Sequence, residues 1–129
     1  MALQDPGDHP HGADEETFNA LFTRDRPVVF AFHGYPHLIH RLLHNRENAP
    51  NVHVHGFREE GSTTTPFDMA VRNRIDRFHL AIAVIDHAGH GAKAAHARQH
   101  FASALIHHER YVRENGTDLP FIREWRWPS

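Results

Sequence analysis

The stretch Val28-Val29-Phe30-Ala31-Phe32, followed at once by His33-Gly34, decides the fold class of this chain of 129 residues. An uninterrupted apolar run of this length, without a polar residue at every second position, is typical of a strand buried on both faces of a parallel sheet. Pro27 precedes the run and Gly34 follows it, so the strand is short and has defined ends. The sequence therefore predicts an α/β fold built on this strand.

Capping residues and periodic apolar positions predict helices and a second strand on both sides of this run. In chain order, the expected elements are a helix over 15–24, the strand over 28–32, a helix from Pro36 to about Arg46, a strand over 52–55, and helices that begin at Pro66, near Phe78 and at Lys93. Asp14, Thr65 and Asp76 stand where capping side chains are expected. The segment Phe78–Ile85 fits the period of a strand as well as that of a helix, and the cap and the frequent alanines favour the helix.

The order of these elements predicts an incomplete parallel βαβ sheet flanked by helices, with an added C-terminal helix that ends at Asn115-Gly116 and an apolar tail over 119–127. Two short strands rarely form a sheet by themselves, because three or more are normally needed to cover the packed faces. We therefore expect a domain that is truncated at its N-terminus or that docks onto a partner. Residues 1–12, with two Pro, two Gly, two Asp and two His, are expected to form a flexible arm, and residues 13–129 the domain.

Composition excludes several classes of protein. Cysteine is absent, which rules out disulfides, zinc-thiolate sites and cysteine nucleophiles. The formal net charge of −2 argues against a nucleic-acid-binding surface, for which a basic excess is typical. No run approaches the ~18 apolar residues that a membrane span needs, and no signal-peptide pattern is seen at the start. Neither nucleic acid nor a membrane is therefore an expected partner.

Fifteen histidines are the unusual feature of the composition. Two interpretations stay open, metal binding and ordinary polar substitution. The pairs His40/His44 and His96/His100 are four residues apart, so each pair shares a helical face on which two ring nitrogens could chelate zinc, nickel or copper. The spacing implies no third ligand, and we assign no metal site. A free-standing histidine-rich module that binds a metal or a small molecule is the alternative to an enzyme domain.

Two further positions are candidates for an anion-binding or interface site. Ser62-Thr63-Thr64-Thr65 precede a predicted helix at the carboxyl end of the second strand, where backbone N–H groups and hydroxyls can bind a phosphate. The alternative is that these residues cap the helix and pack against a neighbouring domain, which the adjacent Glu59-Glu60 favours because it would repel a phosphate. His33 ends the buried strand, where α/β folds place functional groups, and a structural role is its alternative.

Four blocks of sequence carry a resemblance to a known family. They are FAFHGYP (30–36), GFREEGSTTTPFDM (56–69), DRFHL (76–80) and IREWRW (122–127). In this order they resemble the C-terminal region of bacterial phosphoketolases, and the likeness runs from about His9 to the last residue. The threonine-rich turn is also similar to the strand–loop–helix turn of the transketolase C-terminal domain.

The resemblance implies the C-terminal domain, or a fragment, of an aldehyde-lyase that depends on thiamine diphosphate and magnesium. Such enzymes cleave xylulose 5-phosphate or fructose 6-phosphate by phosphorolysis to acetyl phosphate and an aldose phosphate, as cytoplasmic dimers or larger oligomers. The family's Gly-Asp-Gly…Asn pattern, which holds the diphosphate through magnesium, is absent, and Gly7-Asp8-His9 does not match it. We therefore expect no catalytic and no cofactor-binding residues here. The expected role is packing and assembly with the upstream catalytic domains or with a second copy.

Overall fold

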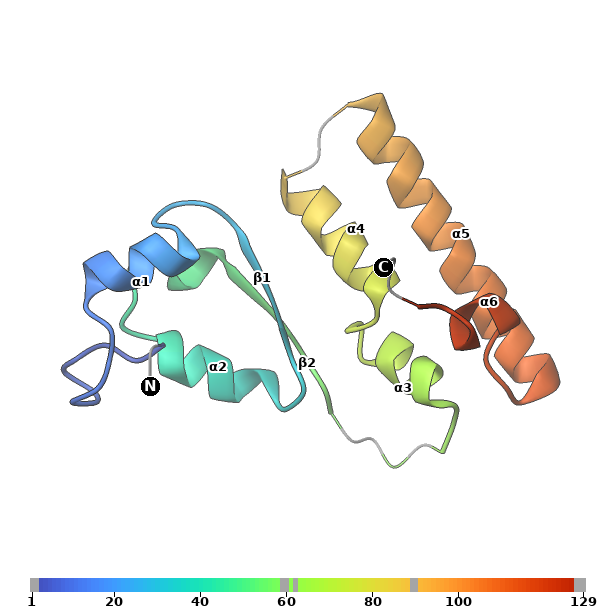
Figure 1. Ribbon diagram of the computed structural model, residues 1–129, viewed down its shortest axis with the longest axis horizontal. Helices are drawn as coiled ribbons and strands as arrows, with labels where there is room; N and C mark the ends of the chain where they lie inside the picture. The colour runs from blue at the N-terminus through green and yellow to red at the C-terminus, as the bar shows by residue number, and fades with distance from the viewer. Residues whose placement is uncertain (1–2, 59–60, 62, 89–90, 127–129) are drawn as a thin grey trace. The chain divides into compact units, whose positions relative to one another are not determined.

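A computed structural model describes residues 3–58, 61, 63–88 and 91–126 of the chain. It divides the chain into two compact units, unit 1 (Met1–Phe57) and unit 2 (Arg58–Ser129). Figure 1 shows that the strands belong to unit 1, whereas unit 2 is helical in its described part. The prediction of a single domain over residues 13–129 stays a prediction.

Unit 1 contains the predicted parallel βαβ element. Its elements are α1 (Glu15–Phe22), β1 (Val28–Phe32), α2 (Pro36–Leu43), the short 3-10 helix η1 (Ala49–Asn51) and β2 (Val52–Gly56). The two strands pair in parallel, with Val28 opposite Val52 and Phe32 opposite Gly56. Gly56 is required at its position, because a Cβ atom there would lie 2.5 Å from the carbonyl oxygen of Gly34 and from the ring of Pro36. The α/β class and the parallel pairing are therefore confirmed.

One face of this sheet carries the core of unit 1. The buried residues of the core are Phe18 of α1, Ile39 and Leu43 of α2, and Val52 of β2. Phe30 and the other residues of β1 on the same face pack against them. Each of these buried side chains contributes roughly 1.5–3 kcal/mol to stability. α1 and α2 thus cover the sheet through a single apolar layer.

The structure corrects the prediction for the opposite face of the sheet, which was expected to be buried. Val29 and Ala31 point away from the core because side chains alternate along a strand, and Ala31 is exposed. The expectation that β1 is buried on both faces is therefore wrong for the described residues. The apolar run predicted the strand correctly, but two strands and two helices leave the second face without the cover that such a run normally has.

Two buried polar side chains organise the loops of unit 1. The Arg46 guanidinium donates hydrogen bonds to the backbone carbonyls of Leu3, Gln4 and Ala13, and it lies 4.3 Å from the centre of the Phe18 ring. Its Nη1 is 2.9 Å from the carboxylate of Glu15. These contacts hold the described part of the N-terminal arm against the core. Arg46 was expected at the end of a helix, but α2 ends at Leu43 and a turn follows in which the Arg46 N–H donates to the Leu43 carbonyl.

The side chain of Asn48 is fully buried next to this turn. Its Nδ2 lies 3.3, 3.1 and 3.3 Å from the carbonyl oxygens of Phe22, Thr23 and Arg26. The buried amide group therefore has hydrogen-bond partners, and it ties the end of α1 and the loop that follows it to the segment after α2.

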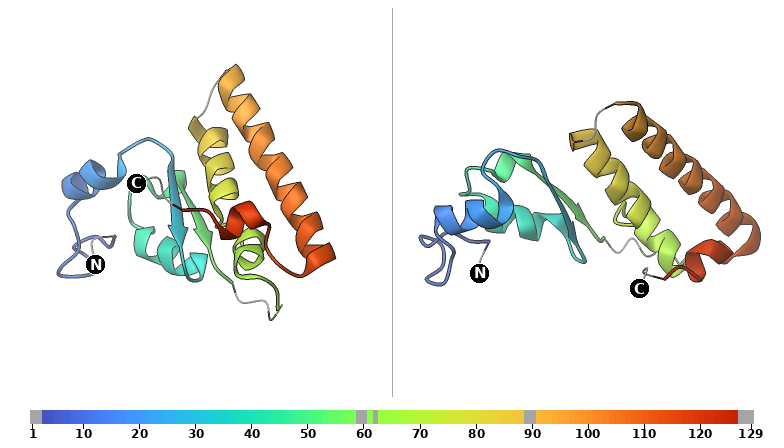
Figure 2. Two further views of the ribbon diagram at one scale, coloured as in Figure 1. Left: turned by 45° about the vertical axis from the view of Figure 1, so that its right-hand side comes forward. Right: turned by 45° about the horizontal axis from the view of Figure 1, so that its top comes forward.

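Unit 2 consists of four helices in its described part. They are α3 (Pro66–Arg72), α4 (Arg77–Ala88), α5 (Ala92–Asn115) and α6 (Pro120–Arg123). α4 packs along α5, and α3 lies beside the C-terminal half of α5, as the views of Figure 2 show. Phe78–Ile85 is therefore helical, as the predicted Asp76 cap favoured. α5 ends as predicted at Gly116, whose φ of 66° is the left-handed conformation that glycine adopts most easily. α6 was not predicted.

The apolar core of unit 2 joins α4 to the C-terminal segment. Phe78, Leu119 and Ile122 are buried together. The Arg77 guanidinium lies within about 5 Å of the ring centres of Phe67, Phe78 and Trp125, and burial lowers the pKa of Arg77 although the charge of Asp76 opposes the shift. The apolar tail is thus held by aromatic and cation–π contacts up to Trp125; Trp127 lies outside the described residues. None of the helices in the described ranges combines the length and apolar character that crossing a bilayer requires.

Candidate functional site

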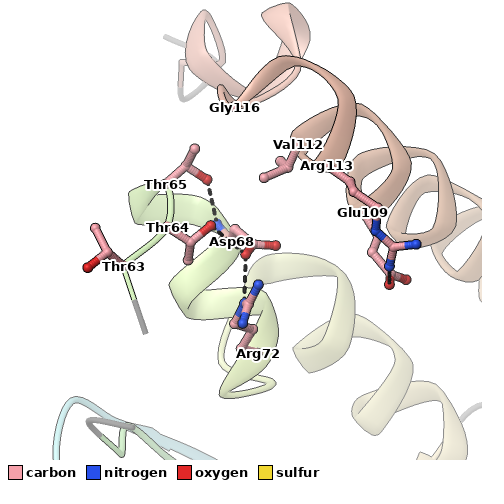
Figure 3. A pocket seen from close by; sticks show the side chains of 9 residues that line it. All are labelled: Thr63, Thr64, Thr65, Asp68, Arg72, Glu109, Val112, Arg113 and Gly116. Atoms are coloured by element: carbon pink, nitrogen blue, oxygen red, sulfur yellow. Dashed lines mark hydrogen bonds and ion pairs between the residues drawn. The ribbon is translucent and has the colours of Figure 1, made fainter. Parts of the chain in front are cut away.

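The threonine turn before α3 is a helix cap joined to two carboxylates. The Asp68 N–H donates to Thr65 Oγ1 at 3.2 Å, which is the predicted cap. The Thr65 hydroxyl in turn donates to Asp118 Oδ1, and the Thr64 hydroxyl donates to Asp68 Oδ2 at 2.8 Å. Figure 3 shows Thr64 and Thr65 turned toward Asp68 at the start of the helix. Both hydroxyl donors are therefore already used by carboxylates of the same unit.

A hollow of about 600 Å³ lies beside this turn. It is lined by Thr63, Thr64, Thr65, Asp68, Arg72, Glu109, Val112, Arg113 and Gly116 (Figure 3). The Arg72 Nε is 2.8 Å from Asp68 Oδ2, and Arg113 Nη2 is 2.7 Å from Glu109 Oε1. The guanidinium groups around the hollow are thus paired with carboxylates, which leaves the lining close to neutral.

Asp68 is the central charge of this arrangement. Burial by itself would raise the pKa of Asp68, but hydrogen bonds from Arg72 and Thr64 and the positive charge of Arg72 hold the pKa below its ordinary value. Asp68 is therefore ionised over the neutral range and anchors α3 to the turn. A phosphate in the hollow would approach this carboxylate as well as that of Glu109, which also lines the hollow.

The lowered pKa of Asp68 makes unit 2 sensitive to acid. A carboxyl group with a lowered pKa in the folded state adds stability above its unfolded value of about 3.9, and this stability is lost as the pH falls through the folded pKa. We expect the protection of unit 2 in hydrogen-exchange mass spectrometry to fall below about pH 4. Asp68→Asn should remove about 1 kcal/mol of stability at pH 7 and reduce the acid-dependent loss. An unchanged acid profile in Asp68→Asn would contradict this role.

A buried histidine lies behind Asp68. His108 of α5 is 0% exposed, and Nε2 of its ring is 3.6 Å from Asp68 Oδ1 and 3.9 Å from Asp118 Oδ1. The ring stands edge-on to Phe67, with 5.1 Å between the ring centres. The threonine turn, α5 and the segment before α6 therefore meet at one cluster of ionisable groups.

A second carboxylate–histidine pair starts α4. Asp76 is buried, and its Oδ1 accepts hydrogen bonds from the backbone N–H groups of Phe78 and His79 at 2.9 and 3.2 Å. Its Oδ2 lies 2.5 Å from Nδ1 of His79. Asp76 therefore both caps the helix and orients the imidazole, which lines a hollow of about 410 Å³ together with Asp68 and Arg72.

The structure brings together only part of the predicted site. Thr63, Thr64 and Thr65 line one hollow, whereas Ser62 and the neighbouring Glu59-Glu60 lie outside the described residues. His33 belongs to unit 1, where its ring is exposed on one side and stacks on Phe57 with 4.7 Å between the centres. Phosphate binding by the threonine turn stays a prediction, and the bonds from its hydroxyls to carboxylates favour the capping alternative.

The histidine pairs keep the helical spacing that the sequence predicts. His44 lies at the end of α2, where its Nδ1 is 2.8 Å from the Arg41 carbonyl oxygen and 3.8 Å from Asp8 Oδ2. Within the described ranges, no group of three or more histidines, aspartates or glutamates is placed to hold a metal ion.

The comparison with known proteins covers the whole chain. Residues 1–127 match the family model described as the XFP C-terminal domain. A "Probable phosphoketolase" of Bradyrhizobium diazoefficiens is 56% identical over 130 residues, which cover 100% of this chain. "Probable phosphoketolase 2" of Rhizobium meliloti is 57% identical over 128 residues (98% of the chain), and a "Probable phosphoketolase" of Gloeobacter violaceus is 54% identical over 129 residues (99%).

The structure is that of an α/β domain, and the relatives that match it along the chain are named phosphoketolase. The chain belongs to the XFP C-terminal domain family. The chain spans 16% of the length of each of the three relatives. The resemblance seen in the four sequence blocks is therefore confirmed, and it concerns one domain of a much longer protein.

Proposed function

We propose that this chain works as the C-terminal domain of a phosphoketolase and contributes packing and assembly to it. The observation that carries the proposal is the match along the whole chain to relatives that are about six times longer. The complete enzyme would cleave xylulose 5-phosphate or fructose 6-phosphate and release acetyl phosphate and an aldose phosphate. The cytoplasm is the expected location.

The uncovered apolar surface of the two units supports a packing role. Ala31 is exposed in the middle of β1, and Leu21 of unit 1 and Ile106 of unit 2 are 64% and 61% exposed. A neighbouring domain can cover such side chains, although single exposed apolar residues also occur on ordinary protein surfaces. We assign its cover to the rest of the phosphoketolase or to a second copy of the domain. Exposed His33 and Thr63 are the predicted site residues that are free to take part in such an interface.

Thiamine diphosphate and magnesium are assigned to the remainder of the enzyme. The cofactor would supply the carbanion that cleaves the sugar phosphate. The residues of this chain do not fit it, since the magnesium-binding sequence pattern is absent and the carboxylates of the hollow in unit 2 are paired with Arg72, Thr64 and Thr65. We therefore derive no catalytic step for these residues.

A chimeric enzyme tests the proposal. The Bradyrhizobium relative is truncated before the region that aligns with this chain, and this chain is then joined in its place. We expect the truncated protein to form little acetyl phosphate from xylulose 5-phosphate and phosphate, and the chimera to recover activity and the oligomeric state of the intact relative. Acetyl phosphate is measured as its hydroxamate, and size is measured by light scattering.

Matched variants of the chimera test whether the recovered activity requires the domain to be correctly folded and packed, or only requires that the additional residues be present. Arg46→Leu breaks the buried contacts of unit 1 and should reduce the recovered activity, whereas Arg24→Leu changes an exposed ion pair with Glu47 and should not. Full activity of the truncated relative, or an assembled chimera that stays as inactive as the truncated protein, would overturn the proposal.

A further inference from the structure

The last residue of α5, Asn115, is the one asparagine of the sequence that a glycine follows. The sequence contains six asparagines, and the other five precede alanine, arginine or valine. Asparagine is thermolabile because its side-chain carbonyl can be attacked by the backbone nitrogen of the next residue. Glycine permits this attack best, since it has no Cβ atom to keep the nitrogen away from the side chain. Asn115-Gly116 is therefore the most reactive pair of this kind in the chain.

The chemistry of this pair changes the charge of the helix end. The Gly116 nitrogen attacks the side-chain carbonyl carbon of Asn115, and the new N–C bond closes a five-membered imide. The side-chain amide group leaves as ammonia, with the proton that the backbone nitrogen gives up. Water then opens the ring at one carbonyl to give aspartate, or at the other to give isoaspartate. Either product carries a new carboxylate at position 115.

Both reacting groups are engaged in hydrogen bonds of the helix end in folded unit 2. The Gly116 N–H donates to the carbonyl oxygen of Val112 at 2.8 Å, and Gly116 holds the left-handed conformation that ends α5. The Asn115 Nδ2 donates to the carbonyl oxygen of Tyr111 at 3.0 Å. The backbone nitrogen therefore keeps its proton in a hydrogen bond, and the side-chain amide is directed back to the preceding turn.

This protection is local, because the end of α5 lies at the surface. Asn115, Gly116 and Thr117 are all exposed. The apolar core resumes at Leu119, which is buried with Phe78 and Ile122. Surface segments of this kind open with a much smaller free energy than the whole fold does. The two hydrogen bonds can therefore open while the core of unit 2 stays folded.

We propose that Asn115 is a site of spontaneous deamidation that is closed while the end of α5 is folded and reactive when its last turn opens. The modified chain carries an additional carboxylate at the C-terminal end of a helix, where the helix dipole is already negative. It also lacks the Nδ2 donor that bonds to the Tyr111 carbonyl. The modification is irreversible under these conditions, so it marks chains whose helix end has opened and weakens that end further.

The gating is measured by mass spectrometry on the unmodified chain at pH 7.5 and 37 °C, in buffer and in guanidinium chloride. Circular dichroism checks that the sample in buffer is helical. Trypsin then releases residues 114–123, in which Asn115 is the only asparagine, and residues 47–58, whose Asn48 and Asn51 are the internal reference. We expect Asn115 to deamidate faster than the reference in the unfolded chain, and at least about tenfold more slowly in the folded chain. Equal rates in the folded and unfolded chains, or no excess over the reference in the unfolded chain, overturn the proposal.

Two variants measure the effect of the modification on the helix end. Asn115→Asp introduces the carboxylate of one product, and Asn115→Gln is the matched control that keeps a neutral amide. Hydrogen exchange of peptides covering residues 111–118 is compared at pH 7.5 and low ionic strength. We expect protection in Asn115→Asp to be about two- to fivefold lower than in Asn115→Gln, the range of a charge at a helix end. Equal protection in the two variants overturns the proposed weakening.

Discussion

Replacing Arg46 by leucine is expected to lower the free energy of unfolding of unit 1 by about 3–5 kcal/mol, the range seen when one partner of a buried charged contact is removed. The guanidinium is almost completely buried and donates to three backbone carbonyls that have no replacement donor in the variant. The side chain of Glu15, its carboxylate partner, is 37% exposed, but its Oε1 atom is buried without a hydrogen-bond partner among the described residues, so both the carboxylate and the carbonyls contribute to the loss. Hydrogen-exchange mass spectrometry of peptides from residues 3–57 measures the change.

Two further variants define what Arg46 contributes. Arg46→Lys keeps the positive charge but not the planar set of five N–H donors, so we expect it to recover only part of the stability. Arg24→Leu is the matched control, since Arg24 and its partner Glu47 are both largely exposed and 3.4 Å apart. If Arg46→Leu changes protection no more than Arg24→Leu does, the clamp on the N-terminal arm is not a stabilising feature.

Replacing Asp76 by alanine is expected to destabilise unit 2 by about 2–4 kcal/mol, from the loss of a helix cap together with a charged hydrogen bond. The Asp76 side chain is 0% exposed, so water cannot replace it at the N–H groups of Phe78 and His79 or at the His79 ring. Asp76→Asn keeps an oxygen acceptor for the cap but not the charge, and we expect an intermediate loss. Exchange protection of peptides from α4 and α5 provides the measurement.

Asp86→Ala is the control for the same helix. Asp86 lies at the other end of α4 and pairs with Arg98 of α5 at 2.6 Å, but both side chains are about half exposed. Hydrogen bonding from Arg98 lowers the pKa of Asp86, yet solvent screens such pairs and we expect little change in stability. Equal effects of Asp76→Ala and Asp86→Ala would show that the buried carboxylate does not hold α4 in place.

Local signals in the sequence predicted most of the elements. The five apolar residues of β1 indicated a strand, and Asp14 caps α1 by accepting from the Thr17 N–H at 2.7 Å. Thr65 and Gly116 begin α3 and end α5 where they were expected to do so. These features depend on residues within four positions of one another, which is why a single sequence contains them.

Features that depend on distant residues could not be predicted in the same way. Arg46 bonds to carbonyls that lie 33 to 43 positions earlier in the chain, and no spacing rule connects them. The open face of β1 depends on how many layers cover it, which an apolar run does not specify. His108 is a different case. It continues the stripe of Phe101, Leu105 and Val112 at spacings of three and four residues, so helical periodicity alone could have indicated that it is buried.

The small side chain of Ala31 has a consequence for whatever covers the open face of unit 1. A single methyl group stands there in the middle of β1, next to Val29, and neither side chain reaches far above the strand. A neighbouring layer can therefore approach the peptide groups of β1 closely. Next to them on the same face of the sheet stand His53 and His55 of β2, which pair with Val29 and Ala31. A covering layer can therefore sit close over β1 but must leave room for two imidazole rings over β2.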